Sequence, residues 1–246
     1  MKLLIDIGNT RIKWATEENK IFSNSLAVEH NQYDFINLIQ QAWIKIGVPK
    51  VIAVSCVSRV EIAKQLIELA KNIWPATSII VAKSLSSGFS VTNAYKDANK
   101  LGVDRWLGLI ALQHYYPGNS IVVDCGTAIT IDALNNHGVH LGGVISPGLA
   151  LMQQALFQGT ERLSIINQTF SVGLSNFTES AIYSGTVYAA VGLIEKVVAD
   201  VCDNCQTLVL TGGDAELLAQ HLNCKAILEP DFIVKGLALY SEGKVK

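Results

Sequence analysis

The chain has 246 residues, half of them hydrophobic and only 16% charged, with a formal net charge of −2 at pH 7. This composition suffices for one large domain or two fused halves with a sizeable core, and it gives no basic footprint for nucleic acid. No secretory leader is visible at the N-terminus, and no apolar run approaches the roughly 20 residues that cross a bilayer. We therefore expect a cytoplasmic protein that binds neither nucleic acid nor a membrane.

The first half of the chain begins with two strands, 2–8 and 11–16, around a short Gly-Asn turn. A helix, a strand, a second helix and a second strand follow, predicted over residues 33–46, 50–57, 60–74 and 78–83. The next stretch, 84–99, is polar and has the composition of a loop. A helix over 103–116 then ends at Pro117-Gly118.

The second half restarts the pattern. Its elements in chain order are strands around a turn at Gly126 within 120–134, a strand over 140–146, helices over 149–157 and 179–201, a strand with a Gly-rich turn over 207–213, a helix over 215–222, the segment 225–229 and a helix over 231–241. The density of apolar residues in 181–201 is compatible with an interface helix and equally with a core helix. We expect two α/β halves, 1–117 and 118–246, with a cleft between them.

The five cysteines, an odd number, favour reduced thiols over a disulfide framework. Cys202 and Cys205 have the C-x-x-C spacing of metal and redox sites, but a structural zinc site would need a second ligand pair. His137 and His140 have an H-x-x-H spacing and flank a predicted hairpin turn. We favour core and turn roles for both pairs over a metal site.

Both halves open with the same device. Asp6 and Asp124 end apolar strands, and Gly8 and Gly126 follow two residues later. A glycine turn lets the backbone approach a ligand, its N–H groups can face phosphate oxygens, and a carboxylate there can hold a cation. One such turn alone is most simply a hairpin connection capped by its own Asp. Two of them, together with the strand-to-helix turn at 211–213, favour a phosphate site.

Three motifs resemble, in order, the first phosphate, second phosphate and adenosine motifs of the acetate-sugar kinase/Hsp70/actin superfamily. They are Asp6-Ile7-Gly8-Asn9-Thr10, Asp124-Cys125-Gly126-Thr127 and Thr211-Gly212-Gly213-Asp214. The segments DIGNTRIKW, GVDRW (102–106), DCGTAITID and GGVISPGL (142–149) together resemble the type III pantothenate kinases, and the chain length matches a minimal two-lobed member.

The resemblance implies an α/β fold of two similar ribonuclease H-like (actin-like ATPase) halves with a nucleotide cleft between them. It implies ATP-dependent phosphorylation of pantothenate to 4'-phosphopantothenate, the first step of coenzyme A biosynthesis. It also implies Mg2+ with ATP, a K+ or NH4+ ion, and a homodimer with the pantothenate site near the subunit interface.

The resemblance further implies a role for each matching residue. Asp104 would be the catalytic proton acceptor, and Asp124 would bind the monovalent cation. Asp6 would hold magnesium through water. The ATP-binding residues would be Asp6, Gly8, Asn9, Thr10, Lys13, Thr127, Gly212 and Gly213. The pantothenate-binding residues would be Tyr95, Gly102, Val103, Asp104, Arg105 and Thr178. Phe177 stands before Thr178 where the family usually has Asn.

The chemistry of these residues also admits plainer roles. Phosphoryl transfer to an alcohol needs a carboxylate near the hydroxyl, but an Asp such as Asp104 at a helix start can simply cap that helix. Arg105 offers a fork for a carboxylate or forms a surface ion pair, and Lys13 is either a phosphate ligand or the outward residue of its strand. Two other functions stay open: a kinase for another small hydroxyl or carboxylate acceptor, and an ATP-binding regulatory module.

Overall fold

The computed structural model describes residues 1–158, 169–201 and 207–243. It divides into two compact units, one of Met1–Tyr115 with the chain from Asp231 onward, and one of Tyr116–Pro230. Cys202 and Cys205 lie outside the described residues.

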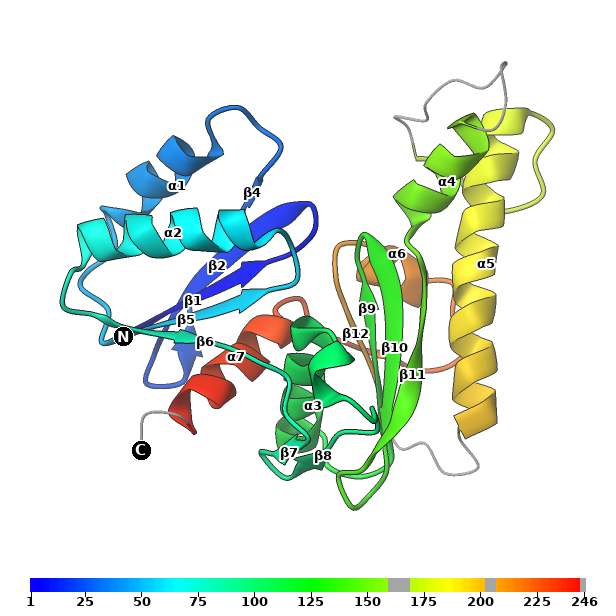
Figure 1. Cartoon of the computed structure of the whole chain (residues 1–246). Coiled ribbons are helices and arrows are strands. Elements are labelled where there is room, and N and C mark those ends of the chain that lie inside the picture. Colours follow the sequence, from blue (N-terminus) through cyan, green and yellow to red (C-terminus); the bar gives the residue numbers. More distant parts are fainter. Residues whose placement is uncertain (159–168, 202–206, 244–246) are drawn as a thin grey trace. The chain divides into compact units, whose positions relative to one another are not determined.

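The first unit is built on a mixed sheet with the strand order β3-β2-β1-β5-β6, and β4 also pairs with β2 (Figure 1). β1 runs antiparallel to β2 and parallel to β5, which runs parallel to β6. The strands are β1 (Lys2–Ile7), β2 (Arg11–Glu18), β3 (Ile21–Phe22), β4 (Leu26–Glu29), β5 (Val51–Cys56) and β6 (Ser78–Val81). The sequence predicted β1, β2, β5 and β6 and missed β3 and β4.

Helices cover both faces of this sheet, as Figure 1 shows. α1 (Phe35–Trp43) and α2 (Val60–Ile73) pack on one face, where the alternate β1 residues Leu3, Ile5 and Ile7 join a core with three tryptophans. On the other face lies α7 (Phe232–Glu242), which contacts β1 and β5. The opposite face of β1, carrying Lys2, Leu4 and Asp6, is therefore the one that meets α7.

The helix α3 (Val103–Tyr115) packs closely on α7. A Cβ atom at Gly236 of α7 would lie 2.1 Å from the carbonyl oxygen of Leu107 in α3. Only glycine permits this approach of two helix backbones. Trp106 and Leu107 of α3 are completely buried, so α3 is a core helix of the unit.

The stretch before α3 is more ordered than its composition predicts. It contains the two-stranded hairpin β7 (Ser87–Gly88) and β8 (Val91–Thr92) and the 3-10 turn η1 (Ala98–Lys100). Its turn places Phe89 and Ser90 at φ of 55° and 60°, a conformation that two-residue hairpin turns require and that sequence patterns assign to Gly or Asn. The ring of Phe89 stacks on Tyr240 of α7 at 5.3 Å between centroids, which explains why a bulky residue occupies that turn.

The second unit repeats the strand pattern of the first. Its sheet has the order β11-β10-β9-β12-β13; β9 is antiparallel to β10 and parallel to β12, which is parallel to β13. The strands are β9 (Ser120–Cys125), β10 (Ala128–Leu134), β11 (His140–Pro147), β12 (Thr207–Thr211) and β13 (Ile227–Leu228). The two sheets share these pairing directions, so the expectation of two similar α/β halves is confirmed.

The helices of the second unit are α4 (Leu149–Gln158), α5 (Thr178–Val201) and α6 (Ala215–Ala219). α5 is long and apolar enough, by length and composition alone, to cross a membrane, contrary to the expectation from apolar runs. Several of its side chains, among them Val187, Ala190 and Ile194, are buried in the core against β9, β10 and β12. The structure thus gives one face of α5 a core role.

The C-terminal segment from Asp231 belongs to the first unit, where α7 packs on α3 and β1. From the sequence we expected it in the second half, 118–246. Sequence order gives no signal for such a return of the chain.

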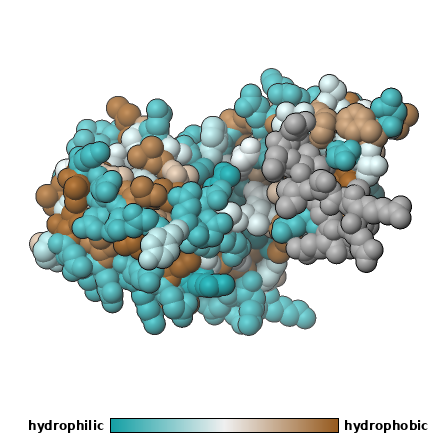
Figure 2. Space-filling model, turned by 90° about the horizontal axis from the view of Figure 1, so that it is seen from above, coloured by the Kyte–Doolittle hydropathy of each residue, from teal (hydrophilic) through white to brown (hydrophobic). Residues whose placement is uncertain are grey.

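Figure 2 shows hydrophobic residues interspersed with hydrophilic ones on the visible face. Exposed apolar side chains include Ile44 and Val60 of the first unit.

The close approach of α3 and α7 predicts opposite effects for two Gly→Ala substitutions. Gly236→Ala should lower the free energy of unfolding by at least about 2 kcal/mol, because the new methyl group collides with backbone that cannot move freely. Gly192→Ala in α5 meets no atom within 4 Å and should raise stability by up to about 1 kcal/mol, since alanine favours the helix. Urea unfolding followed by circular dichroism measures both; equal stability of the two variants would contradict the packing.

Candidate functional site

Polar side chains of the first unit gather at the carboxyl ends of the parallel strands β1 and β5. Asp6 of β1 lies directly opposite Ser55 of β5 and opposite Lys13 of β2. Asp104, in the first turn of α3, is close enough to influence the charge of Asp6. The carboxyl ends of parallel strands are where α/β sheets bind ligands, and we call these four residues the acidic cluster.

The pKa of Asp6 departs strongly from its ordinary value. Burial, and then the neighbouring carboxylate of Asp104, raise its pKa from 3.8 to about 6, while Ser55 and Lys13 act in the opposite direction. Among the described residues, neither Oδ1 of Asp6 nor Oγ of Ser55 has a hydrogen-bond partner, although both atoms are buried. A buried carboxylate oxygen without a donor is unfavourable in the free protein, and such groups cluster at functional sites.

The side chain of Lys13 is held from α7. Its Nζ donates to Oδ1 of Asp231 at 3.2 Å, and both side chains are about one-third exposed or less. Lys13 is therefore more than the outward residue of its strand. It is the partly buried cation of the acidic cluster.

Hydrogen bonds hold the turn after β1, which the sequence predicts to be a phosphate loop. The N–H of Gly8 donates to the carbonyl of Arg11 at 2.9 Å, which closes the turn. The ring of His30 lies 2.7 Å from the carbonyl of Asn9, and the N–H of His30 donates to the carbonyl of Thr10. His30 thus fixes the loop from the end of β4, a strand that the sequence did not predict.

The segment GVDR brings together the residues expected to bind the acceptor. Oδ1 of Asp104 accepts from the N–H of Arg105 at 2.7 Å and would lie 2.5 Å from a Cβ at Gly102, so this carboxylate folds back over the glycine. Val103 begins the helix and is buried. The guanidinium of Arg105, 6% exposed, donates to the hydroxyl of Tyr95 at 2.9 Å. Arg105 is therefore a buried cation.

In the second unit, the second phosphate and adenosine motifs lie side by side. Asp124 at the end of β9 pairs in register with Thr211 of β12. Gly212 has a φ of 94°, and a Cβ there would lie 2.4 Å from the carbonyl oxygen of Cys125 and 2.6 Å from Oδ1 of Asp124. The N–H of Asp214 donates to that same Cys125 carbonyl. Only glycine can occupy position 212 in this arrangement.

The turn after Asp124 is closed as tightly as the first. The N–H of Gly126 donates to the carbonyl of Ala128, and that of Gly148 donates to the carbonyl of Thr127 at 2.9 Å. Gly213 has open space around its missing side chain. Thr178 is exposed at the start of α5, in the second unit. The expected ATP residues Thr127, Gly212 and Gly213 are thereby brought together.

Three residues of the first site were missed by sequence reasoning: Ser55, His30 and Asp231. Ser55 follows the apolar run of β5 just as Asp6 follows that of β1, and this parallel was a usable signal. Asp231 and His30 gave none, because their contacts depend on strand pairing and on the return of the chain.

The two histidines of the H-x-x-H pair lie in different surroundings. Nε2 of His140 lies 2.9 Å from Oδ1 of Asp132 in the core, whereas His137 is exposed in its turn. Among the described residues, no three His, Cys, Asp or Glu side chains form a group that could hold a metal unaided. A divalent ion that arrives with a nucleotide needs only one or two protein carboxylates, and the unpaired Oδ1 of Asp6 beside Asp104 fits that requirement.

The raised pKa of Asp6 predicts a pH-dependent gain in stability for Asp6→Asn. Between pH 3.8 and about pH 6, Asp6 is protonated in the folded state but ionised in the unfolded state. The free energy of unfolding of the wild type therefore falls as the pH rises through this window. Without metal or nucleotide, Asp6→Asn should be more stable by up to about 3 kcal/mol above pH 7. The gain should disappear near pH 4. Thermal unfolding across this range measures it, and a gain independent of pH would contradict the assignment.

Comparisons with known proteins agree with one another. The family model for type III pantothenate kinase matches residues 2–200. A type III pantothenate kinase of Nitrosococcus oceani is 36% identical over 97% of this chain and 92% of its own. One from Dichelobacter nodosus is 35% identical over 96% of each chain.

Solved structures show the same fold at low sequence identity. A Baf family protein from Campylobacter jejuni has a TM-score of 0.62 at 24% identity and covers 99% of this chain and 98% of its own. The activator of 2-hydroxyisocaproyl-CoA dehydratase from Clostridium difficile, solved with bound ADPNP, has a TM-score of 0.58 at 15% identity and covers 100% of this chain and 98% of its own. The fold is thus the two-lobed, actin-like ATPase fold. On its sequence, the chain belongs to the type III pantothenate kinase family.

Proposed function

We propose that this protein transfers the γ-phosphoryl group of ATP to pantothenate and releases 4'-phosphopantothenate and ADP, the first step of coenzyme A biosynthesis. The relatives named for this activity match nearly the whole chain. The observation that carries the proposal is the acidic cluster, because it puts a buried, unpaired carboxylate, Asp6, beside a second one, Asp104. Metal-bound phosphate and a proton acceptor are the two needs of phosphoryl transfer to an alcohol.

Asp6 and Lys13 are the residues of the first unit that would meet the phosphates. A divalent ion, Mg2+ in this proposal, supplies neutralisation of the phosphate charge when it is bound with ATP, and Oδ1 of Asp6 would hold it directly or through water. The N–H of Asn9 in the Gly8-Asn9-Thr10 turn and the Lys13 ammonium would donate to the phosphate oxygens. In the second unit, Thr127, Gly212 and Gly213 would contact the nucleotide.

Asp104 would accept the proton of the pantothenate hydroxyl. As the hydroxyl oxygen bonds to the γ-phosphorus, the bond from that phosphorus to the bridging oxygen of ADP breaks and the hydroxyl proton passes to Asp104. Gly102 leaves the space into which this carboxylate folds. Arg105, fixed by Tyr95, presents a buried cation suited to the carboxylate of pantothenate, and Val103 and Thr178 complete the proposed acceptor site.

Three further features belong to the proposal and rest on the family resemblance. Asp124 would hold a K+ or NH4+ ion, and its carboxylate lies close to the turns at Gly126 and Gly212. The active form would be a cytoplasmic homodimer. Its pantothenate site would lie near the subunit interface.

The test of the function is ADP release from Mg-ATP with and without pantothenate, in potassium and in sodium buffer. We expect release that requires pantothenate and is much faster in potassium. Release that ignores pantothenate but needs a sugar or acetate would replace the acceptor, and nucleotide binding without acceptor-dependent release would indicate a regulatory module. Pantothenate-dependent release that is indifferent to the ion would remove the cation role of Asp124.

Asp104→Asn should lower kcat by about 10²- to 10⁴-fold, because an amide cannot take the proton. Nucleotide affinity should change little, since Asp104 faces the acceptor in this proposal. Steady-state kinetics and calorimetric titration with Mg-ADP measure the two effects. A variant with wild-type kcat would exclude Asp104 as the proton acceptor.

A further inference from the structure

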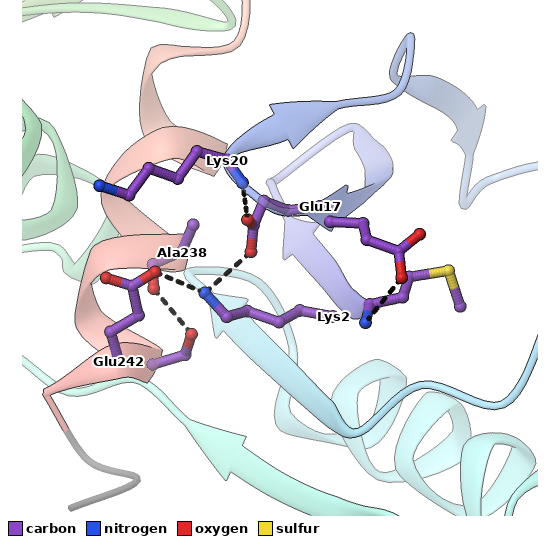
Figure 3. Close-up of polar contacts among 8 residues, drawn as sticks. Lys2, Glu17, Lys20, Ala238 and Glu242 are labelled. Carbon is purple, nitrogen blue, oxygen red and sulfur yellow. Dashed lines mark hydrogen bonds and ion pairs between the residues drawn. The ribbon is translucent and has the colours of Figure 1, made fainter.

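Two ion pairs tie α7 to the β1–β2 hairpin, one at each end of the helix. At its C-terminal end Glu242 accepts from Nζ of Lys2 at 2.7 Å, and Figure 3 shows Lys2 lying between Glu242 and Glu17 of β2. At its N-terminal end Asp231 accepts from Lys13 at 3.2 Å. The helix spans about 16 Å between these carboxylates, close to the roughly 13 Å from Lys2 to Asp6 along β1. α7 therefore runs along β1 with its N-terminus beside the acidic cluster.

The pairing of the strands would by itself bring Lys13 onto Asp6. The two residues are directly opposite each other in the antiparallel β1–β2 pair, and oppositely charged side chains at such positions attract and contact each other. In the structure, Oδ1 of Asp6 nevertheless has no hydrogen-bond partner, and the ammonium of Lys13 is drawn to Asp231. Asp231 thus competes with Asp6 for the same cation.

In the described part of the chain, the carboxylate of Asp231 contacts Lys13 and takes no part in capping its own helix. Asp231 stands at the N-cap of α7, where an Asp side chain usually accepts from the N–H groups of the first turn. Its side chain makes no capping hydrogen bond. The carboxylate of Asp231 accepts a hydrogen bond from Lys13 instead.

We propose that Asp231 is a positioning residue that holds the Lys13 ammonium away from Asp6 and so keeps Oδ1 of Asp6 open for the divalent ion of the nucleotide. This inference rests on the proposed function only in taking Asp6 as the metal carboxylate and Lys13 as a phosphate ligand. Without Asp231, Lys13 would settle on Asp6 and both would be withdrawn from the nucleotide.

The test is the affinity for Mg-ADP, measured by calorimetric titration without pantothenate, so it does not depend on the identity of the acceptor. Asp231→Asn keeps the size and the N-cap preference of the residue but removes its charge. We expect at least about tenfold weaker Mg-ADP binding, in line with loss of a charged hydrogen bond, and a higher Mg2+ concentration for half-maximal binding. Asp231→Glu should recover most of the affinity. Unchanged binding by Asp231→Asn would overturn the proposal even if pantothenate is phosphorylated normally.

A double variant shows whether Asp231 acts through Lys13. Lys13→Met alone weakens Mg-ADP binding by removing a phosphate ligand, but it cannot leave a cation on Asp6. Adding Asp231→Asn to it should change the affinity by less than about twofold, because the two effects then share one cause. A further tenfold loss in the double variant would mean that Asp231 contacts the nucleotide or metal itself, which contradicts the positioning role.

Glu242→Gln is the matched control, since it breaks the corresponding ion pair at the other end of the same helix. Lys2 keeps Glu17 as a partner at 2.8 Å, so the strand stays anchored. We expect Mg-ADP affinity within about twofold of wild type, as for a surface ion pair far from a ligand. If Glu242→Gln weakens binding as much as Asp231→Asn does, the effect comes from loosening α7 and the positioning role is refuted.

Discussion

The contact of α7 with α3, backbone against backbone at Gly236 and Leu107, is the constraint on which the acidic cluster depends. α3 carries Asp104 in its first turn, and α7 presents Asp231 at its N-cap. β1 and β2, which carry Asp6 and Lys13, lie against α7. Fixing the two helices to each other therefore fixes four charged groups that come from three distant parts of the chain. Packing density, which allows little adjustment, sets the geometry of the charges.

This arrangement keeps an unfavourable group in place. A buried carboxylate next to a second one opposes folding at neutral pH, and the pKa of Asp6 records this. The hydrophobic core beneath it, with Leu3, Ile5 and Ile7 of the same strand completely or almost completely buried, more than offsets the penalty. A site that binds a cation with its phosphates needs polar groups that are unsatisfied when the ligand is absent. The buried residues of β1 hold such a group, Asp6, in place.

Much of this could be predicted from the sequence, because it depends on local patterns. Apolar periodicity located the long strands and helices, and the Asp-x-Gly turns at Asp6 and Asp124 identified the two halves and the loops that we propose to bind phosphate. The rest depends on contacts between distant residues. Asp231 reaches Lys13 only because the chain returns to the first unit, and His30 reaches Asn9 only through the short strand β4. Phe89 occupies a turn position that usually holds Gly or Asn, because its ring stacks on Tyr240 of α7. No local pattern contains that information.

In this structure Lys13 contacts Asp231, and we propose that Oδ1 of Asp6 is left to receive the divalent ion of the nucleotide. Crystals grown with Mn2+ and a non-hydrolysable ATP analogue test it most directly, because manganese is located by its anomalous scattering. We expect a manganese peak beside Asp6, bound directly at about 2.1 Å or through one water, with Lys13 in contact with Asp231 or a phosphate. Manganese bound elsewhere, with the Lys13 ammonium on Asp6, would contradict it.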